Sequence, residues 1–79
     1  MIEIYTRSNC PLCVATKSFL VEKQVEYVEY VLGQDIMKED LLQKFPHAKV
    51  VPIIMINGYQ IAGLSELKTI VNSNQLGAF

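Results

Sequence analysis

Several features of membrane and secreted proteins are missing from this sequence of 79 residues. It has no tryptophan, one histidine and two cysteines, and none of its apolar runs approaches the ~20 residues of a membrane span. Its start lacks the basic cluster and long apolar centre of a secretory signal peptide. We therefore expect no membrane segment and a cytoplasmic location.

An excess of positive charge is also missing. Seven Lys and Arg residues stand against eight Asp and Glu residues, which gives a formal net charge of −1. Nucleic-acid-binding domains usually carry a basic surface, so we expect no nucleic-acid partner. A closed zinc site needs four ligands, and His47 is the only histidine that could join the two cysteines. Zinc binding is therefore a weak alternative.

Apolar residues, in contrast, are abundant and make up 51% of the sequence. This share can supply a core in a chain close to the lower size limit for a domain without cross-links. The sequence contains no repeats, low-complexity segments or linkers. We expect residues 1–79 to form a single domain that is a monomer.

Residue patterning predicts an α/β fold with the element order β-α-β-α-β-β-α. The predicted strands are residues 2–6, 26–32, 50–56 and 59–62, and the predicted helices are residues 11–24, 36–45 and 65–71. The unbroken apolar run of the third strand indicates a central strand, and Asn57-Gly58 predicts a type I′ hairpin turn. Combined with a right-handed crossover, this order gives a four-stranded mixed sheet with helices on both faces.

Helix starts and buried helix faces can also be predicted. Asp35 and Ser65 are the expected N-caps of the second and third helices, because their side chains can accept from free backbone N–H groups. Apolar spacing gives the expected inward faces, which are Thr16, Phe19, Leu20 and Lys23 on the first helix and Met37, Leu41, Leu42 and Phe45 on the second.

Both cysteines lie in one motif, Cys10-Pro11-Leu12-Cys13, where the first strand leads into the first helix. Cysteines three residues apart at a helix start are about 5 to 6 Å apart, which permits a disulfide. Pro11 suits the first helical position, so Cys10 is expected at the N-cap, where free N–H groups and the helix dipole favour a thiolate. A purely structural disulfide is disfavoured because the loop it closes is very short. Redox chemistry is the favoured interpretation.

The expected chemistry is thiol–disulfide exchange. A Cys10 thiolate would attack a substrate disulfide, and the less exposed Cys13 would then resolve the mixed disulfide. Between Arg7 and Phe19 the sequence has two cations, Arg7 and Lys17, and no acidic residue. We expect this positive surrounding to favour the thiolate further.

Three segments, in this order, resemble the glutaredoxins of the thioredoxin-like fold. They are the Cys-Pro-X-Cys motif, Val51-Pro52 before the third strand, and residues 62–67, Ala-Gly-Leu-Ser-Glu-Leu. The resemblance covers nearly the whole chain and is strongest to small dithiol members of bacteria and bacteriophages. It implies an enzyme without bound cofactor that uses glutathione as co-substrate. Its substrates would be glutathione mixed disulfides and protein disulfides, such as that of ribonucleotide reductase.

The resemblance also implies a glutathione site. Val51 would pair its backbone with the cysteinyl part of glutathione, and Pro52 would follow a cis peptide bond. Arg7 would bind the glycyl carboxylate, and Lys49 is a weaker candidate for the same contact. Each of these basic residues could instead be an ordinary solvated surface charge.

The start of the last helix would bind the γ-glutamyl carboxylate through Gly63, Leu64 and Ser65, because free N–H groups there attract anions. Leu12 would line the site between the two cysteines. Three residues depart from the family pattern, and they are Leu12, Val50 and Ala62. These departures affect glutathione contacts and not the thiols.

Two related functions remain open. The first is a thioredoxin-like electron donor, for example to ribonucleotide reductase, that a reductase rather than glutathione reduces. The second is a carrier that holds a [2Fe–2S] cluster through glutathione, which Pro11 disfavours because cluster-binding relatives usually have a smaller residue there. A cysteine hydrolase with His47 as base is disfavoured, because His47 lies in a loop beyond the second helix.

Overall fold

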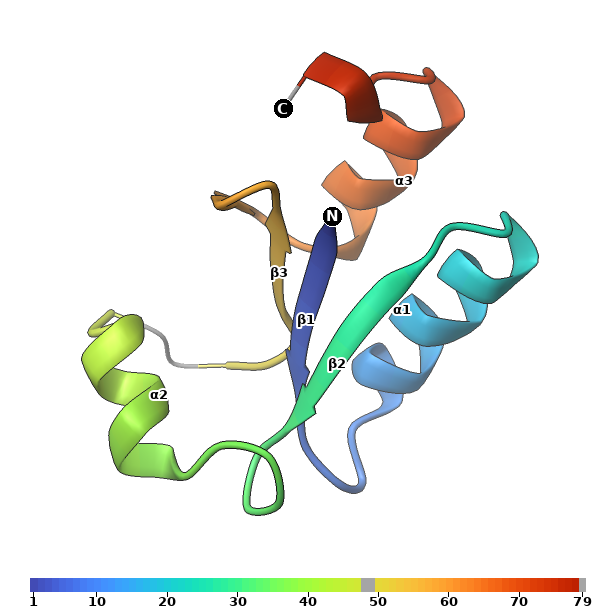
Figure 1. Ribbon diagram of the computed structural model, residues 1–79. Helices are drawn as coiled ribbons and strands as arrows, with labels where there is room; N and C mark the ends of the chain where they lie inside the picture. Colours follow the sequence, from blue (N-terminus) through green and yellow to red (C-terminus); the bar gives the residue numbers. More distant parts are fainter. Residues whose placement is uncertain (48–49, 79) are drawn as a thin grey trace.

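The computed structural model describes residues 1–47 and 50–78 and has the predicted order of elements (Figure 1). The strands are β1 (Ile2–Thr6), β2 (Tyr27–Val31), β3 (Ile53–Ile56) and β4 (Tyr59–Ile61). The helices are α1 (Pro11–Glu22), α2 (Lys38–Lys44) and α3 (Leu64–Asn72), followed by a short 3-10 helix, Leu76–Ala78. In this part of the chain, no helix is both long enough and apolar enough to cross a bilayer.

The strands form one mixed sheet in the order β2-β1-β3-β4, as predicted. β1 is parallel to β2, with Ile2 opposite Tyr27, and antiparallel to β3, with Ile2 also opposite Ile56. β3 is antiparallel to β4. Central placement of β3 is confirmed, but the strand begins at Ile53 and not at residue 50. Val50 is 78% exposed and lies before the strand, outside its pairing with β1 and β4.

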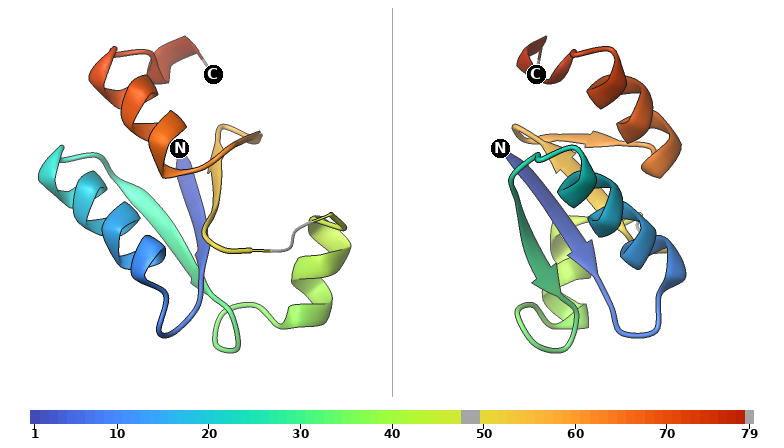
Figure 2. Two further views of the ribbon diagram at one scale, coloured as in Figure 1. Left: turned by 180° about the vertical axis from the view of Figure 1, so that it is seen from behind. Right: turned by 90° about the vertical axis from the view of Figure 1, so that its right-hand side faces the viewer.

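Helices cover both faces of the sheet, which confirms the predicted layers. Figures 1 and 2 show α1 and α3 on one face and α2 on the other. The core under α1 and α3 consists of Ile2, Ile4, Phe19, Leu20, Ile54, Ile56, Ile61, Leu67 and Ile70. The smaller core under α2 consists of Tyr5, Leu41, Phe45 and Ile53. Successive residues of a strand thus pack on opposite faces of the sheet, as the two-residue period of a strand requires.

The hairpin between β3 and β4 has the predicted turn. Asn57 and Gly58 have φ angles of 50° and 88°, and a type I′ turn requires positive φ at both central residues. The Asn57 N–H donates to the Met1 carbonyl oxygen at 2.9 Å, and the Met1 amino group donates to Asn57 Oδ1. The turn therefore also fixes the start of the chain against the sheet.

Both predicted N-caps are wrong. Met37 precedes α2 as its cap residue, while Asp35 accepts the Val31 N–H at 2.8 Å within the turn that follows β2. Asp35 lies two residues before the cap position, and its carboxylate is used inside that turn, so it does not cap the helix. At α3 the cap residue is Gly63, so Ser65 lies one residue inside the helix.

The predicted inward faces are partly wrong. On α1, Thr16, Phe19 and Leu20 are buried, but Lys23 is exposed because the helix ends at Glu22. On α2, Leu41 and Phe45 are buried, whereas Met37 and Leu42 are 46% and 40% exposed. Because α2 has only seven residues, only one narrow row of its side chains can pack against the sheet.

Candidate active site

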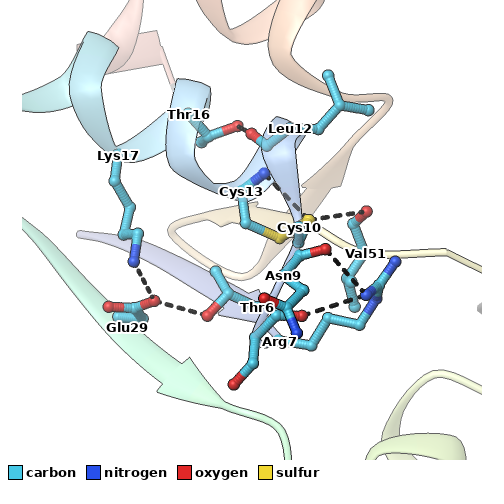
Figure 3. Close-up of a disulfide and its surroundings, with 11 residues drawn as sticks. Thr6, Arg7, Asn9, Cys10, Leu12, Cys13, Thr16, Lys17, Glu29 and Val51 are labelled. Atoms are coloured by element: carbon cyan, nitrogen blue, oxygen red, sulfur yellow. Dashed lines mark hydrogen bonds and ion pairs between the residues drawn. A yellow bond between two sulfur atoms is a disulfide. The ribbon is translucent and has the colours of Figure 1, made fainter.

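Cys10 and Cys13 form a disulfide at the start of α1, with their Cα atoms 5.2 Å apart (Figure 3). Cys10 has the extended backbone of an N-cap residue, and Pro11 is the first residue of the helix. Both placements confirm the sequence prediction. An N–H at the first position of a helix has no partner within the helix. Proline has no backbone N–H, so it suits this position.

The free N–H groups of the first helical turn point toward Cys10. The Cys13 N–H donates to Cys10 Sγ at 3.1 Å, and the Val14 N–H donates to the Cys10 carbonyl oxygen at 3.1 Å. A helix start carries partial positive charge, which adds to the effect of the first of these hydrogen bonds. Negative charge on the Cys10 sulfur is therefore favoured over negative charge deeper in the helix.

Access also differs between the two cysteines, in the direction that the sequence predicted. Cys10 is 4% exposed and Cys13 is 1% exposed, so neither is an open surface thiol. Cys10 nevertheless lines two adjacent hollows, of about 610 and 560 Å³, while Cys13 lines only the smaller one. A substrate sulfur can thus approach Cys10 from two sides.

We call the larger hollow the apolar cleft. It is lined by Arg7, Cys10, Pro11, Leu12, Leu32, Lys38, Leu41, Leu42, Val50 and Val51. Its volume of about 610 Å³ lies within the ~300–1,000 Å³ range of small-molecule sites. Sequence reasoning missed the lining residues from the end of β2 and from α2. Their only signal was that α2 has more apolar residues, such as Leu42, than its single buried stripe can use.

Val51 and Pro52 are joined by a cis peptide bond, which confirms the expectation from the family resemblance. The Val51 carbonyl oxygen lies 3.9 Å from Cys10 Sγ (Figure 3). Residues 41 positions apart in the sequence therefore meet at the sulfur. The backbone of Val51 thus lies next to the Cys10 sulfur, where a strand-like contact with a substrate would be needed.

Arg7 lies in the loop before the disulfide and lines both hollows. Its Nη1 donates to the carbonyl oxygens of Ser8 and Asn9, at 3.2 and 3.4 Å. These bonds hold the guanidinium beside Cys10 and leave its charge without a carboxylate partner among the described residues. Lys49, the weaker candidate, lies outside the described residues.

The segment at the start of α3 is not brought into either hollow. Gly63, Leu64 and Ser65 open the helix as expected, but none of them, nor Pro52, is among the described residues that line the two hollows. The Glu66 carboxylate accepts the Ala62 N–H at 3.3 Å, so an acidic group already lies at this helix start. The predicted carboxylate site there remains a prediction.

A second group of interacting side chains, to one side of the disulfide, was not predicted. The Thr6 hydroxyl donates to Glu29 Oε2 at 2.6 Å, and Lys17 Nζ lies 3.0 Å from the same oxygen (Figure 3). The Thr6 bond has the largest effect on the pKa of Glu29; burial opposes it and Lys17 reinforces it, so the pKa is lowered. Because Glu29 neutralises Lys17, the expectation of two free cations near Cys10 is wrong. β2 brings in an acid that local sequence could not reveal.

The other candidates do not join the site. His47 is exposed in the turn after α2 and lines neither hollow. Within residues 1–47 and 50–78, no group of three or more His, Cys, Asp or Glu side chains could hold a metal ion.

Comparison with known proteins agrees with this geometry. The glutaredoxin family model matches residues 2–61, which include the disulfide motif, the cis-proline segment and the whole sheet. The chain belongs to the glutaredoxin family. Glutaredoxin 3 of Escherichia coli is 32% identical over 66 residues, which are 84% of this chain and 80% of the relative. Thiol–disulfide exchange is therefore the activity of this glutaredoxin.

Solved structures place the fold in the same group. Glutaredoxin 1 from Francisella tularensis has a TM-score of 0.75 at 25% identity, over 92% of this chain and 93% of that one. The thioredoxin-like protein BC3987 has a TM-score of 0.72 at 30% identity, over 89% of this chain and 99% of that one. Both likenesses extend over almost the entire domain.

Proposed function

We propose that this chain is a dithiol glutaredoxin that reduces protein disulfides and glutathione mixed disulfides, with glutathione as co-substrate. The observation that carries the proposal is the environment of Cys10 Sγ. It accepts a helix N–H, lies 3.9 Å from the Val51 carbonyl oxygen, and lines a cleft of about 610 Å³. A thiolate, a backbone contact and space for a substrate thus meet at one atom.

Cys10 has the role of nucleophile. In the reduced protein, the helix N-terminus and the Cys13 N–H stabilise a negatively charged sulfur on Cys10 and so favour its thiolate form. The thiolate attacks one sulfur of a substrate disulfide, the substrate S–S bond breaks, and the other sulfur leaves as a thiolate that takes up a proton. The product is a mixed disulfide between Cys10 and the substrate.

Cys13 has the role of resolving thiol. Its thiolate attacks Cys10 Sγ, the mixed disulfide breaks, and the substrate leaves as a second thiol. The substrate has then gained two electrons and the chain holds the Cys10–Cys13 disulfide that the structure describes. Two glutathione molecules restore the dithiol in two further exchanges and are oxidised to glutathione disulfide.

Glutathione is proposed to bind across the cis-proline segment. Its cysteinyl backbone would pair with Val51, beside Pro52, and its glycyl carboxylate would meet Arg7, whose charge faces the same hollow. Leu12 would contact it between the cysteines. The γ-glutamyl end would reach the start of α3 at Gly63, Leu64 and Ser65.

Replacing each cysteine by serine tests the proposal. In an assay with glutathione, its reductase and a glutathionylated peptide, we expect Cys10→Ser to abolish turnover. Cys13→Ser should keep turnover of that peptide but lose reduction of a protein disulfide, because it has no resolving thiol. Ser18→Ala, an exposed change on α1, is the control. Activity that survives in Cys10→Ser would reverse the roles, as would faster alkylation of Cys13 in the reduced protein.

A thioredoxin-like donor is the second candidate. Two observations favour it, namely the Glu66 carboxylate at the α3 start and the 30% identity to a thioredoxin-like protein. An acidic group there would repel the γ-glutamyl carboxylate of glutathione. Turnover with NADPH and thioredoxin reductase, without turnover from glutathione, would support this candidate over the first.

A further inference from the structure

The apolar cleft includes residues to which the proposed glutathione site assigns no role, namely Leu32, Lys38, Leu41, Leu42 and Val50. Its inner wall is the core itself, since Leu41 is 6% exposed and Leu32 packs against the smaller core. From there its lining extends from Cys10, at the start of α1, to α2. Figure 2 shows α2 on the face of the sheet opposite α3. The proposed γ-glutamyl contact at α3 therefore lies away from the α2 side of the cleft.

Apolar side chains around the opening of the cleft are exposed to solvent. Val50 is 78% exposed, Leu12 is 59% exposed and Leu42 is 40% exposed, and all three line the cleft. They come from three separate segments of the chain, which meet only in the fold. A contiguous exposed apolar surface of this kind is a common mark of a binding site.

The charged groups of the cleft have one sign. Arg7 and Lys38 are the only charged residues among the described ones that line it, and neither forms an ion pair within those residues. Glu39 and Asp40 follow Lys38 on α2 but do not line the cleft. An occupant that complements this surface has an apolar body and a negative charge.

We propose that the cleft binds an extended segment of a protein substrate, in which the reactive cysteine is flanked by a large apolar residue and an acidic residue. The apolar side chain covers Leu42 and Val50, while the carboxylate meets Lys38 or Arg7. The Val51 backbone, beside Cys10 Sγ, aligns the segment. This inference rests on the proposed function and names its protein partner by chemistry. Glutathione has carboxylates but no large apolar side chain, so it would leave this surface exposed.

Symmetric disulfides of four short blocked peptides test the inference. Each peptide has one cysteine, flanked by Leu and Asp, Leu and Lys, Ser and Asp, or Ser and Lys. In a symmetric disulfide, Cys10 must attack a peptide sulfur, so the peptide itself enters the cleft. Reduced protein is mixed with each disulfide, and the released peptide thiol is followed by chromatography in a single turnover.

We expect the Leu–Asp peptide to react about tenfold faster than the Ser–Lys peptide. Burial of one leucine side chain and one favourable charge contact should each raise the rate several-fold. Leu42→Ser should reduce the preference for leucine about threefold, and Lys38→Glu should reverse the preference for aspartate over lysine. Both residues are on the surface of a short helix. Urea unfolding of each variant shows directly that the fold is retained.

Val21→Ser and Lys23→Glu are the matched controls. Val21 is 65% exposed and Lys23 is also exposed, at the end of α1 far from the disulfide. They repeat the same chemical changes outside the cleft, so both should keep the wild-type order of peptides. A loss of preference in the controls as well as in the cleft variants would contradict the inference.

The outcomes separate this inference from the proposed function. Equal rates for all four peptides, with normal turnover of a glutathionylated peptide, would overturn the inference and leave the proposed function standing. No reaction with any disulfide would instead refute the proposed function. A dimer in sedimentation that Leu42→Ser dissociates, without a change in peptide preference, would assign the cleft to a second copy of this chain.

Discussion

Glu29→Gln is expected to destabilise the protein and to remove part of its pH dependence. Glu29 lies on β2, and its Oε2 receives both the Thr6 hydroxyl, at 2.6 Å, and Lys17 Nζ, at 3.0 Å. These contacts connect the end of β1, the middle of β2 and the second turn of α1. In Figure 3, Lys17 and Glu29 lie to one side of the Cys10–Cys13 disulfide, with Thr6 between them and the cysteines.

The magnitude follows from what glutamine can replace. A hydrogen bond to a charged group is worth about 1.5–3 kcal/mol, and one to a neutral group about 1 kcal/mol. Thr6 is 1% exposed, but the Glu29 side chain is 24% exposed, so the lower end of the range applies. The Lys17 pair is partly exposed and adds about 0.5 kcal/mol. Glutamine keeps a neutral bond to Thr6, so the net loss is about 1 kcal/mol.

The pH dependence has a definite sign. The contacts lower the pKa of Glu29 from its ordinary value of 4.5. A group with a lowered pKa in the folded state stabilises it fully above the ordinary value, and this contribution is lost as the pH falls below it. The difference between wild type and Glu29→Gln should therefore be full at pH 7 and should decrease steadily below pH 4.5.

Urea unfolding measures both effects. For a domain of this size a loss of 1 kcal/mol shifts the midpoint by about 1 M urea, or the melting temperature by about 4–8 °C. A double-mutant cycle with Thr6→Val should give a Thr6–Glu29 coupling of about 1 kcal/mol at pH 7. Glu26→Gln, an exposed change just before β2, is the control. Equal stabilities of Glu29→Gln and wild type at pH 7 would refute the reasoning.

Three further predictions concern the core, the hairpin and the glutathione site. Ile54→Ala removes a fully buried side chain of β3 and should cost about 2–5 kcal/mol in unfolding free energy. Gly58→Ala should lower the unfolding free energy by about 1 kcal/mol, because φ at this position is +88°. A new Cβ would meet nothing within 4 Å, so the cost comes from the backbone conformation alone. A variant as stable as the wild type would contradict the assigned turn. Arg7→Gln should raise the KM for glutathione about fivefold with little change in kcat, as a partly exposed charge contact implies, whereas the exposed Lys23→Gln should not.

The sequence predicted those parts of the structure that depend on local pattern. Alternation marks β1, the Asn57-Gly58 pair marks the hairpin, and Pro11 marks the first residue of α1. Each of these signals depends on only a few neighbouring residues, so the structure that it predicts does not depend on the rest of the fold. The cis bond before Pro52 differs, because only the family resemblance favoured it.

The errors arise where a competing contact or the end of a helix overrides the local pattern. Asp35 has the side chain of an N-cap, but the turn after β2 uses its carboxylate for the Val31 N–H. Lys17 looked like a free cation until the parallel pairing of β1 with β2 placed Glu29 beside it. Leu42 has the spacing of a core residue, yet the shortness of α2 leaves it on the cleft. Only the Lys17 contact joins segments that are distant in the sequence. Asp35 is used by a neighbouring backbone N–H, and Leu42 is left exposed by the length of its own helix.

Neutralisation of Lys17 changes the account of why Cys10 is reactive. With Glu29 bound to Lys17, the local positive charge consists of Arg7 and the α1 N-terminus. Arg7 is exposed, so dissolved salt screens its effect on the sulfur. The Cys13 N–H, in contrast, lies 3.1 Å from Cys10 Sγ in a buried contact that salt cannot reach. The backbone hydrogen bond, rather than the surrounding side-chain charge, is therefore the main support for the proposed Cys10 thiolate, and substrate binding is the role proposed for Arg7.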